Sequence, residues 1–116
     1  MITNTPTTTI VFVDAQVANY QNLLKQVQPD TEFLLINADQ DGIEQITNTL
    51  KERQNITSVQ IISHGSEGQI QLGTTRLNRD SIQAYREQLQ QWRKALTAEA
   101  DILLFGLSVL VRVRSF

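Results

Sequence analysis

A chain of 116 residues with 41% hydrophobic and 19% charged residues is long enough for one globular domain and too apolar for intrinsic disorder. Its formal net charge of −2 and pI near 5.3 argue against a nucleic-acid-binding protein, which needs a concentrated basic surface. The absence of cysteine excludes disulfides, thiolate metal sites and thiol catalysis by this chain. We expect no metal or other cofactor, because only one histidine is present and no acidic loop has calcium-binding spacing.

The N-terminal segment, residues 1–8, is rich in threonine and is predicted to be a flexible leader. It lacks the basic and apolar stretches of a signal peptide. No apolar run in the chain is long enough to span a membrane, so we expect no membrane-spanning segment. The residues themselves leave the localisation open.

The first elements are a buried strand and an amphipathic helix. The continuous apolar run at residues 9–13 predicts a strand that is covered on both faces. Asp14 follows the strand and is predicted to cap the next helix. That helix is predicted to end before Pro29, and its apolar positions have helical spacing: Val17, Tyr20, Leu24 and Val27. A second buried strand is predicted at residues 33–36.

The second helix is predicted to begin at Asp41, because Asp41 and Glu44 have the spacing of a capping box. Its apolar face holds Ile43, Ile46 and Leu50. Residues 56–63 then form a third buried strand. Residues 68–77 alternate polar and apolar side chains around a Gly-Thr-Thr turn, which favours a small, half-exposed hairpin.

A third helix and a fourth buried strand complete the pattern. Asn78 or Asp80 is placed to cap the helix, whose apolar stripe consists of Ile82, Tyr85, Leu89, Trp92 and Leu96. The strand is predicted at residues 102–105. The alternation predicts a three-layer α/β fold with a mostly parallel sheet of about four strands, three helices and a small hairpin.

The only histidine, His64, stands directly after the third strand and before Gly65. Open α/β sheets place their binding and catalytic groups at the carboxyl ends of parallel strands. His64 is therefore a candidate general base, with the backbone N–H groups of Gly65 and Ser66 nearby. A structural role, in which the imidazole orders the loop through local hydrogen bonds, agrees with the sequence equally well.

Two other polar residues are weaker candidates. Ser66 is not expected to be a serine-hydrolase nucleophile, because His64 stands where the nucleophile elbow needs glycine and no histidine follows. Asp14 is not expected to accept a phosphoryl group, because Gln16 stands where the haloacid-dehalogenase pattern has a second aspartate. The glycines are too scattered to form a nucleotide-binding loop.

Several short motifs together resemble one bacterial family. They are IVFVD at residues 10–14, DGIEQI at 41–46, ISHGS at 62–66, GQIQLG at 68–73 and LLFG at 103–106. The family is a domain of unknown function found, often in cyanobacteria, near the N-termini of very large surface or secreted proteins with cadherin-like and calcium-binding repeats. The resemblance covers residues 9–106 and implies a parent protein of adhesin type, secreted or at the cell surface.

That family in turn resembles the caspase–gingipain clan of cysteine peptidases. In the clan, a strand ending in His-Gly supplies the base, and the next parallel strand ends in the nucleophilic cysteine. On this resemblance His64 and Gly65 match the base motif, and Leu107 occupies the nucleophile position after Gly106. A leucine side chain cannot attack a carbonyl, and Ser108 comes one residue too late. We therefore expect a vestigial site and no peptidase activity.

Residues 107–116 depart from the preceding pattern. No acidic residue follows Asp101, and the segment has neither a helix cap nor a helical stripe, although a doubly wound sheet needs a helix here. We interpret residues 107–116 as the product of truncation or a shifted reading frame, in preference to a naturally degenerate relative, and the fold as an incomplete caspase-like fold. The fourth strand would then be an apolar edge that promotes self-association. The alternative is a segment that covers this edge itself after a tight reversal at Gly106.

Three functions agree with the sequence. The favoured one is a non-catalytic fragment or pseudoenzyme derived from a caspase-like domain of a large surface-associated protein. The second is a cysteine-peptidase-like module in a full-length parent, with His64 as the base and the nucleophile lost only from this copy. The third is a plain structural or interaction module, which needs no catalytic residue.

Overall fold

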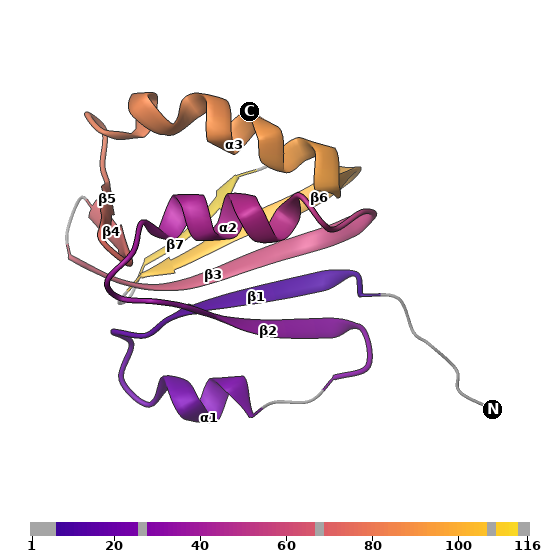
Figure 1. The fold of residues 1–116 in the computed structure, drawn as a ribbon, viewed down its shortest axis with the longest axis horizontal. Helices are drawn as coiled ribbons and strands as arrows, with labels where there is room; N and C mark the ends of the chain where they lie inside the picture. The colour runs from indigo at the N-terminus through magenta and orange to yellow at the C-terminus, as the bar shows by residue number, and fades with distance from the viewer. Residues whose placement is uncertain (1–6, 26–27, 67–68, 107–108, 114–116) are drawn as a thin grey trace.

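The computed structural model describes residues 7–25, 28–66, 69–106 and 109–113, and for residues 64–66, 69, 106 and 109–113 it describes the backbone only. Within this part of the chain, seven strands form one sheet. Its centre is parallel and has the order β2 (Thr31–Ile36), β1 (Thr9–Asp14), β3 (Ile56–Ser66) and β6 (Leu96–Gly106). The predicted α/β fold with a mostly parallel sheet of about four strands is confirmed (Figure 1).

The helices lie on both sides of the sheet. In Figure 1, α2 (Gly42–Leu50) and α3 (Arg86–Trp92) lie above the strands, and α1 (Tyr20–Leu24) lies below them. Two 3₁₀ turns, η1 (Ile82–Tyr85) and η2 (Arg93–Ala95), flank α3. The three predicted layers and three helices are therefore present.

The main hydrophobic core lies between the sheet and the pair α2–α3. Its buried residues are Ile10, Phe12, Ile36, Ile43, Ile46, Leu50, Ile56, Val59, Ile61, Leu72, Leu77, Trp92, Ala95 and Ile102. Ile10 and Phe12 of β1 belong to this core, while the alternate residues Val11 and Val13 are buried outside it. Because successive side chains of a strand point to opposite faces, β1 is covered on both faces, as its continuous apolar run predicts.

Helix α2 follows its sequence signals closely. The carboxylate of Asp41 accepts a hydrogen bond from the backbone N–H of Glu44 at 3.0 Å, which is the predicted N-cap. The predicted apolar face, Ile43, Ile46 and Leu50, is buried against the sheet. The capping residue and the helical spacing of the apolar residues were therefore sufficient to predict this helix.

The first helix differs from its prediction. It has only five residues, and its N-cap is Asn19, so Asp14 does not cap it. Two backbone N–H groups, one from Gln16 and one from the distant Gly73, bind the carboxylate of Asp14 instead. The chain between β1 and α1 therefore forms turns. Val27, predicted for the helical stripe, lies outside the described residues.

The third helix is shorter and less regular than predicted. The side chain of Asn78 accepts hydrogen bonds from the N–H groups of Asp80 and Ser81, so it caps the turn that precedes η1. Of the predicted stripe, Trp92 is buried, but Ile82 is exposed and Leu96 already belongs to β6. The 3₁₀ turns at both ends rotate the side chains away from one continuous helical face.

Strand β3 continues past its predicted end. After its parallel partners end, it pairs in antiparallel fashion with β4 (Gln69–Leu72), placing His64 opposite Gln71. Strand β4 then forms the predicted hairpin with β5 (Thr75–Leu77). His64 therefore lies inside a strand, at the point where the strand exchanges parallel neighbours for an antiparallel one.

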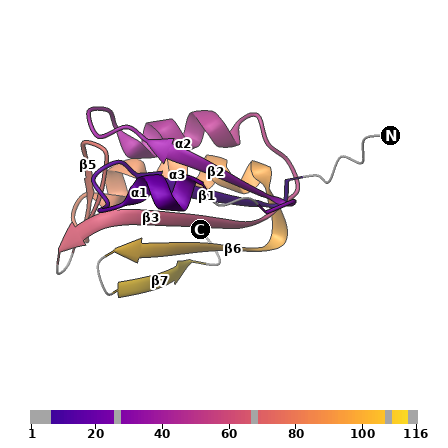
Figure 2. The ribbon, with the colours of Figure 1, turned by 90° about the horizontal axis from the view of Figure 1, so that it is seen from below.

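The fourth parallel strand is not an edge, so the expectation of an unpaired β6 is wrong. Strand β7 (Val109–Val113) pairs in antiparallel fashion with β6, from Gly106 opposite Val109 to Ile102 opposite Val113. Figure 2 shows β7 beyond β6 at the side of the sheet. The segment thus folds back onto β6, which satisfies the backbone groups of β6 and transfers the edge position to β7.

Strand β2 occupies the opposite edge of the sheet. Leu35 is 38% exposed, so the expectation of a second buried strand is wrong at this residue, because β2 is an edge strand and α1 is short.

Glu32, also in β2, accepts two hydrogen bonds from the guanidinium of Arg53, at 2.7 and 3.0 Å. This interaction raises the pKa of Arg53 against the opposing effect of its partial burial.

Candidate functional site

The carboxyl ends of the parallel strands meet at one edge of the sheet. Strands β3 and β6 are parallel neighbours there, with Ser63 in register with Gly106. His64 and Leu107 are the residues that directly follow this pair in the sequence. The side chain of His64 and the whole of Leu107 lie outside the described part of the chain, so the roles assigned to them stay predictions.

Ser63 joins the two strands at this edge. Its buried side-chain hydroxyl donates a hydrogen bond to the backbone carbonyl of Phe105 at 2.8 Å. The bond holds the last residues of β6 against β3, one position before His64. A hydroxyl at the end of an apolar strand is the only feature of the sequence that relates to this role.

Asp14 is a buried carboxylate at the end of β1, with no measurable exposure. One oxygen, Oδ1, accepts a hydrogen bond from the backbone N–H of Gln16, and the other, Oδ2, accepts one from the N–H of Gly73, both at 2.7 Å. Charge-assisted bonds of this kind are stronger than neutral ones. Asp14 therefore fastens the turn of the β4–β5 hairpin to the sheet.

Gly73 occupies a position that only glycine fits. Its φ is +59°, in the left-handed region, and a Cβ at this residue would lie 1.9 Å from the carbonyl oxygen of Gln40. The next residue, Thr74, donates its backbone N–H to the same Gln40 oxygen at 2.8 Å. The hairpin turn thus packs directly on the loop between β2 and α2.

Two glutamine side chains bind the carbonyl oxygen of Gly73. The side-chain amide of Gln16 donates to it at 3.2 Å, and that of Gln71 donates at 3.3 Å. Gln71 is also the antiparallel register partner of His64. Strand β4, which contains Gln71 and directly precedes Gly73, therefore links the turn to the backbone of His64.

Asp41 connects the hairpin to the helical layer. Besides capping α2, its carboxylate accepts a hydrogen bond from the hydroxyl of the buried Thr75 at 2.6 Å. A weaker bond, at 3.4 Å, comes from the hydroxyl of Tyr85 in η1. The sequence predicted the cap but not the two hydroxyl donors, because they come from residues more than thirty positions away.

The arrangement limits the chemistry of this edge. Both aspartates are engaged in hydrogen bonds that hold the hairpin, and the described ranges contain no group of three His, Cys, Asp or Glu residues able to hold a metal ion. Ser66 lies in β3 opposite Gln69, not on the strand-to-helix turn of a nucleophile elbow. His64 therefore stays the candidate base that the sequence predicts at this edge.

Comparison with known proteins identifies one family. A family model described as a domain of unknown function (DUF4347) matches residues 10–111. The match covers the hairpin and the four parallel strands except for Thr9, the first residue of β1, and extends beyond Gly106 into β7. No curated protein and no solved structure matches the chain. Among the described residues, no helix combines the length and the apolar character needed to cross a membrane.

Proposed function

The chain belongs to the DUF4347 family of domains of unknown function, and from this premise we propose that it is a non-catalytic, caspase-like module, a pseudoenzyme with a vestigial peptidase site. The main support is the parallel register of Ser63 with Gly106. It brings together the two strand ends that, on the resemblance to the caspase–gingipain clan, carry the base and the nucleophile. The residues that follow are His64 and Leu107.

The proposal that the module lacks activity rests on chemistry. Peptide hydrolysis by this route needs a nucleophile that attacks the carbonyl after the imidazole accepts its proton. Leu107 has no such group, and the chain has no cysteine. Asp14 and Asp41 are occupied by hydrogen bonds to the hairpin. The imidazole of His64 therefore has no nucleophile to activate.

We further propose that the parent is a large, surface-associated or secreted protein of adhesin type, with cadherin-like and calcium-binding repeats, as in cyanobacteria. Only the resemblance of the sequence motifs supports this context. An antibody against the domain would test it on fractionated source cells. Detection in the surface or medium fraction is expected, and detection in the cytosol alone would contradict the proposal.

The absence of activity can be tested with fluorogenic peptides that carry basic, acidic or apolar residues before the scissile bond. We expect the chain and its His64→Ala variant to give the same background rate. Turnover that disappears in His64→Ala would overturn the proposal. It would favour the alternative, a working peptidase-like module in which His64 is the base and another residue is the nucleophile.

The ancestry of the site can be tested through one introduced thiol, since the chain has no cysteine to interfere. A nearby imidazolium stabilises a thiolate, so the pKa of the thiol introduced by Leu107→Cys should lie below its usual value. Adding His64→Ala should raise this pKa again, and Ser108→Cys serves as the matched control. The pH dependence of alkylation by iodoacetamide measures all three.

We expect Leu107→Cys alone to restore little hydrolysis, because a thiolate without a substrate cleft has nothing to position a peptide. Equal thiol pKa values with and without His64 would mean that the two positions do not interact. The caspase-like proposal would then fail, and a plain structural or interaction module would be the better description.

A further inference from the structure

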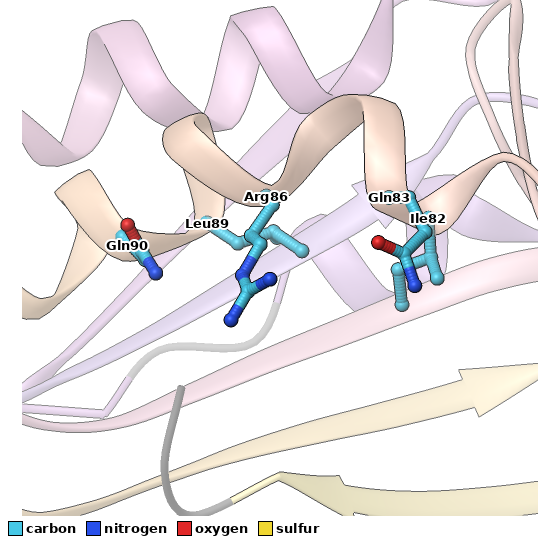
Figure 3. Close-up of a pocket in the computed structure, with 5 residues that line it drawn as sticks. All are labelled: Ile82, Gln83, Arg86, Leu89 and Gln90. Carbon is cyan, nitrogen blue, oxygen red and sulfur yellow. The ribbon is translucent and has the colours of Figure 1, made fainter.

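A second surface lies on η1 and α3, on the side that faces away from α2 (Figure 3). Its residues line a hollow of about 200 Å³: Ile82, Gln83, Arg86, Leu89 and Gln90. Ile82 and Gln83 come from η1, and Arg86, Leu89 and Gln90 come from α3. This surface, which we call the α3 groove, uses none of the residues of the carboxyl edge.

The opposite side of α3 is firmly anchored. The indole N–H of the buried Trp92 donates a hydrogen bond to the hydroxyl of Thr47 in α2 at 2.8 Å. The hydroxyl of Tyr85 in η1 binds Asp41, the cap of α2. These contacts fix the orientation of α3, so the α3 groove is a preformed surface.

The α3 groove exposes apolar surface that the fold does not bury. Ile82 is 44% exposed, and the only other exposed large apolar side chain in the described ranges is Leu35, at 38%, on the distant strand β2. Leu89 is half-buried and packs against the core. An apolar side chain of a partner would therefore pack between Leu89, which the core holds in place, and the exposed Ile82.

Arg86 supplies the charge of the α3 groove. Figure 3 shows it between Gln90 on one side and Ile82 with Gln83 on the other. The described part of the chain gives it no ion pair, whereas Arg53 is paired with Glu32. A guanidinium that has no ion pair within the described ranges and lies beside apolar surface is complementary to a partner that brings a carboxylate with its apolar side chains.

We propose that the α3 groove binds an amphipathic helix with an acidic residue among its apolar positions. A helix suits the place, because the helical layer stops at α3 while the sheet continues through β6 to β7 (Figure 2). Within α3, Leu89 and Gln90 lie three and four residues after Arg86, and side chains with this spacing form the ridges that a second helix packs against. Two copies of the α3 groove related by a two-fold axis at the central Arg86 would bring two guanidinium groups together, which disfavours that arrangement.

The proposal can be tested with three stapled peptides of roughly 20 residues, a length that supports helix formation. The peptides share one amphipathic leucine pattern and differ only in a central residue, which is Glu, Gln or Lys. Binding is measured by fluorescence anisotropy on the complete 116-residue chain. We expect the Glu peptide to bind at least about tenfold more tightly than the Lys peptide.

Charge reversal gives the decisive result. Arg86→Glu, at an exposed position, should invert the preference in favour of the Lys peptide. Ile82→Ser should weaken all three peptides, and Lys51→Glu, an equal charge change at the end of α2, should alter none of the affinities. Binding that ignores Arg86 and Ile82, or no binding of any peptide, would overturn the proposal. Circular dichroism melting verifies that each variant is folded.

Discussion

Oδ2 of Asp14 accepts a hydrogen bond from the backbone N–H of Gly73 at 2.7 Å, although the two residues lie 59 positions apart in the sequence. Asp14 ends the strand β1, and Gly73 forms the turn between β4 and β5. This contact, together with the pairing of β3 with β4, holds the hairpin at the edge of the sheet where β3 carries His64. The stability of the hairpin is therefore expected to depend on a carboxylate from the start of the chain.

Asp14→Asn should lower the free energy of unfolding by about 1–3 kcal/mol, the cost of leaving a buried donor without an acceptor. Both oxygens of Asp14 accept backbone N–H groups, and an asparagine would turn its NH₂ group toward one of them. Urea unfolding followed by the fluorescence of Trp92 measures the loss. Asp39→Asn, at an exposed loop position, is the control, and equal losses in both variants would contradict the structural role of Asp14.

Gly73→Ala should loosen the hairpin. The substitution adds a Cβ 1.9 Å from the carbonyl oxygen of Gln40 and forces a left-handed φ on a residue with a side chain. The strained conformation alone costs about 1–3 kcal/mol, and the clash requires the turn to shift. Amide hydrogen exchange should accelerate throughout β4 and β5 but not in β1. Thr74→Ala, at the exposed neighbouring position, should leave these rates unchanged, and unchanged rates in Gly73→Ala as well would show that the turn does not pack as described.

Thr47→Val should destabilise the contact between α2 and α3. The hydroxyl of Thr47 accepts the indole N–H of the buried Trp92, and valine keeps the shape but removes the acceptor. The unsatisfied donor should cost about 1–3 kcal/mol in urea unfolding. Thr49→Val is a matched control. The hydroxyls of Thr47 and Thr49 each donate a hydrogen bond to a backbone carbonyl one turn earlier in α2, that of Ile43 and that of Gln45. Only the bond from Trp92 to Thr47 distinguishes the two positions. Equal losses in the two variants would show that the bond to Trp92 contributes nothing.

The parts of the fold that the sequence predicted correctly are those encoded locally. The cap at Asp41, the apolar face of α2, the parallel strands and the hairpin all follow from spacing within a few residues. The carboxyl ends of parallel strands meet at one edge of such a sheet, so the sequence pattern also predicted that the end of β3, where His64 follows Ser63, lies beside the end of β6. Local pattern was enough to locate the edge.

The contacts that the sequence did not reveal all join residues far apart in the chain. Asp14 looked like a helix cap because nothing local identifies Gly73 as its partner, and Thr75 and Tyr85 gave no sign of binding Asp41. The pairing of β7 with β6 was only the less favoured interpretation of the sequence, for a related reason. This pairing depends on backbone hydrogen bonds, which any residue except proline can make, so side-chain pattern carried little information.

Strand β7 leads to the last prediction, which concerns residues 107–116. The sequence suggested that this segment was never selected to fold, and its removal should then leave unfolding unchanged. In the structure, however, five residues of the segment pair with Ile102 to Gly106 of β6. Deletion of residues 107–116 should therefore remove several backbone hydrogen bonds, each contributing about 0.5–1.5 kcal/mol, and lower the free energy of unfolding.

The same deletion should also make the protein associate, because β6 would become the unpaired apolar edge that β7 now covers. Sedimentation velocity over a range of concentrations measures this effect, and urea unfolding measures the loss of stability. Deletion of residues 114–116 alone is the matched control, since it leaves every paired position of β7 in place. If the longer deletion were monomeric and as stable as the full chain, β7 would contribute nothing to the fold, and a segment from a shifted reading frame would explain the result. Association together with lost stability in the longer deletion alone would instead establish β7 as a working edge strand, because only the removal of its pairing with β6 distinguishes the two variants.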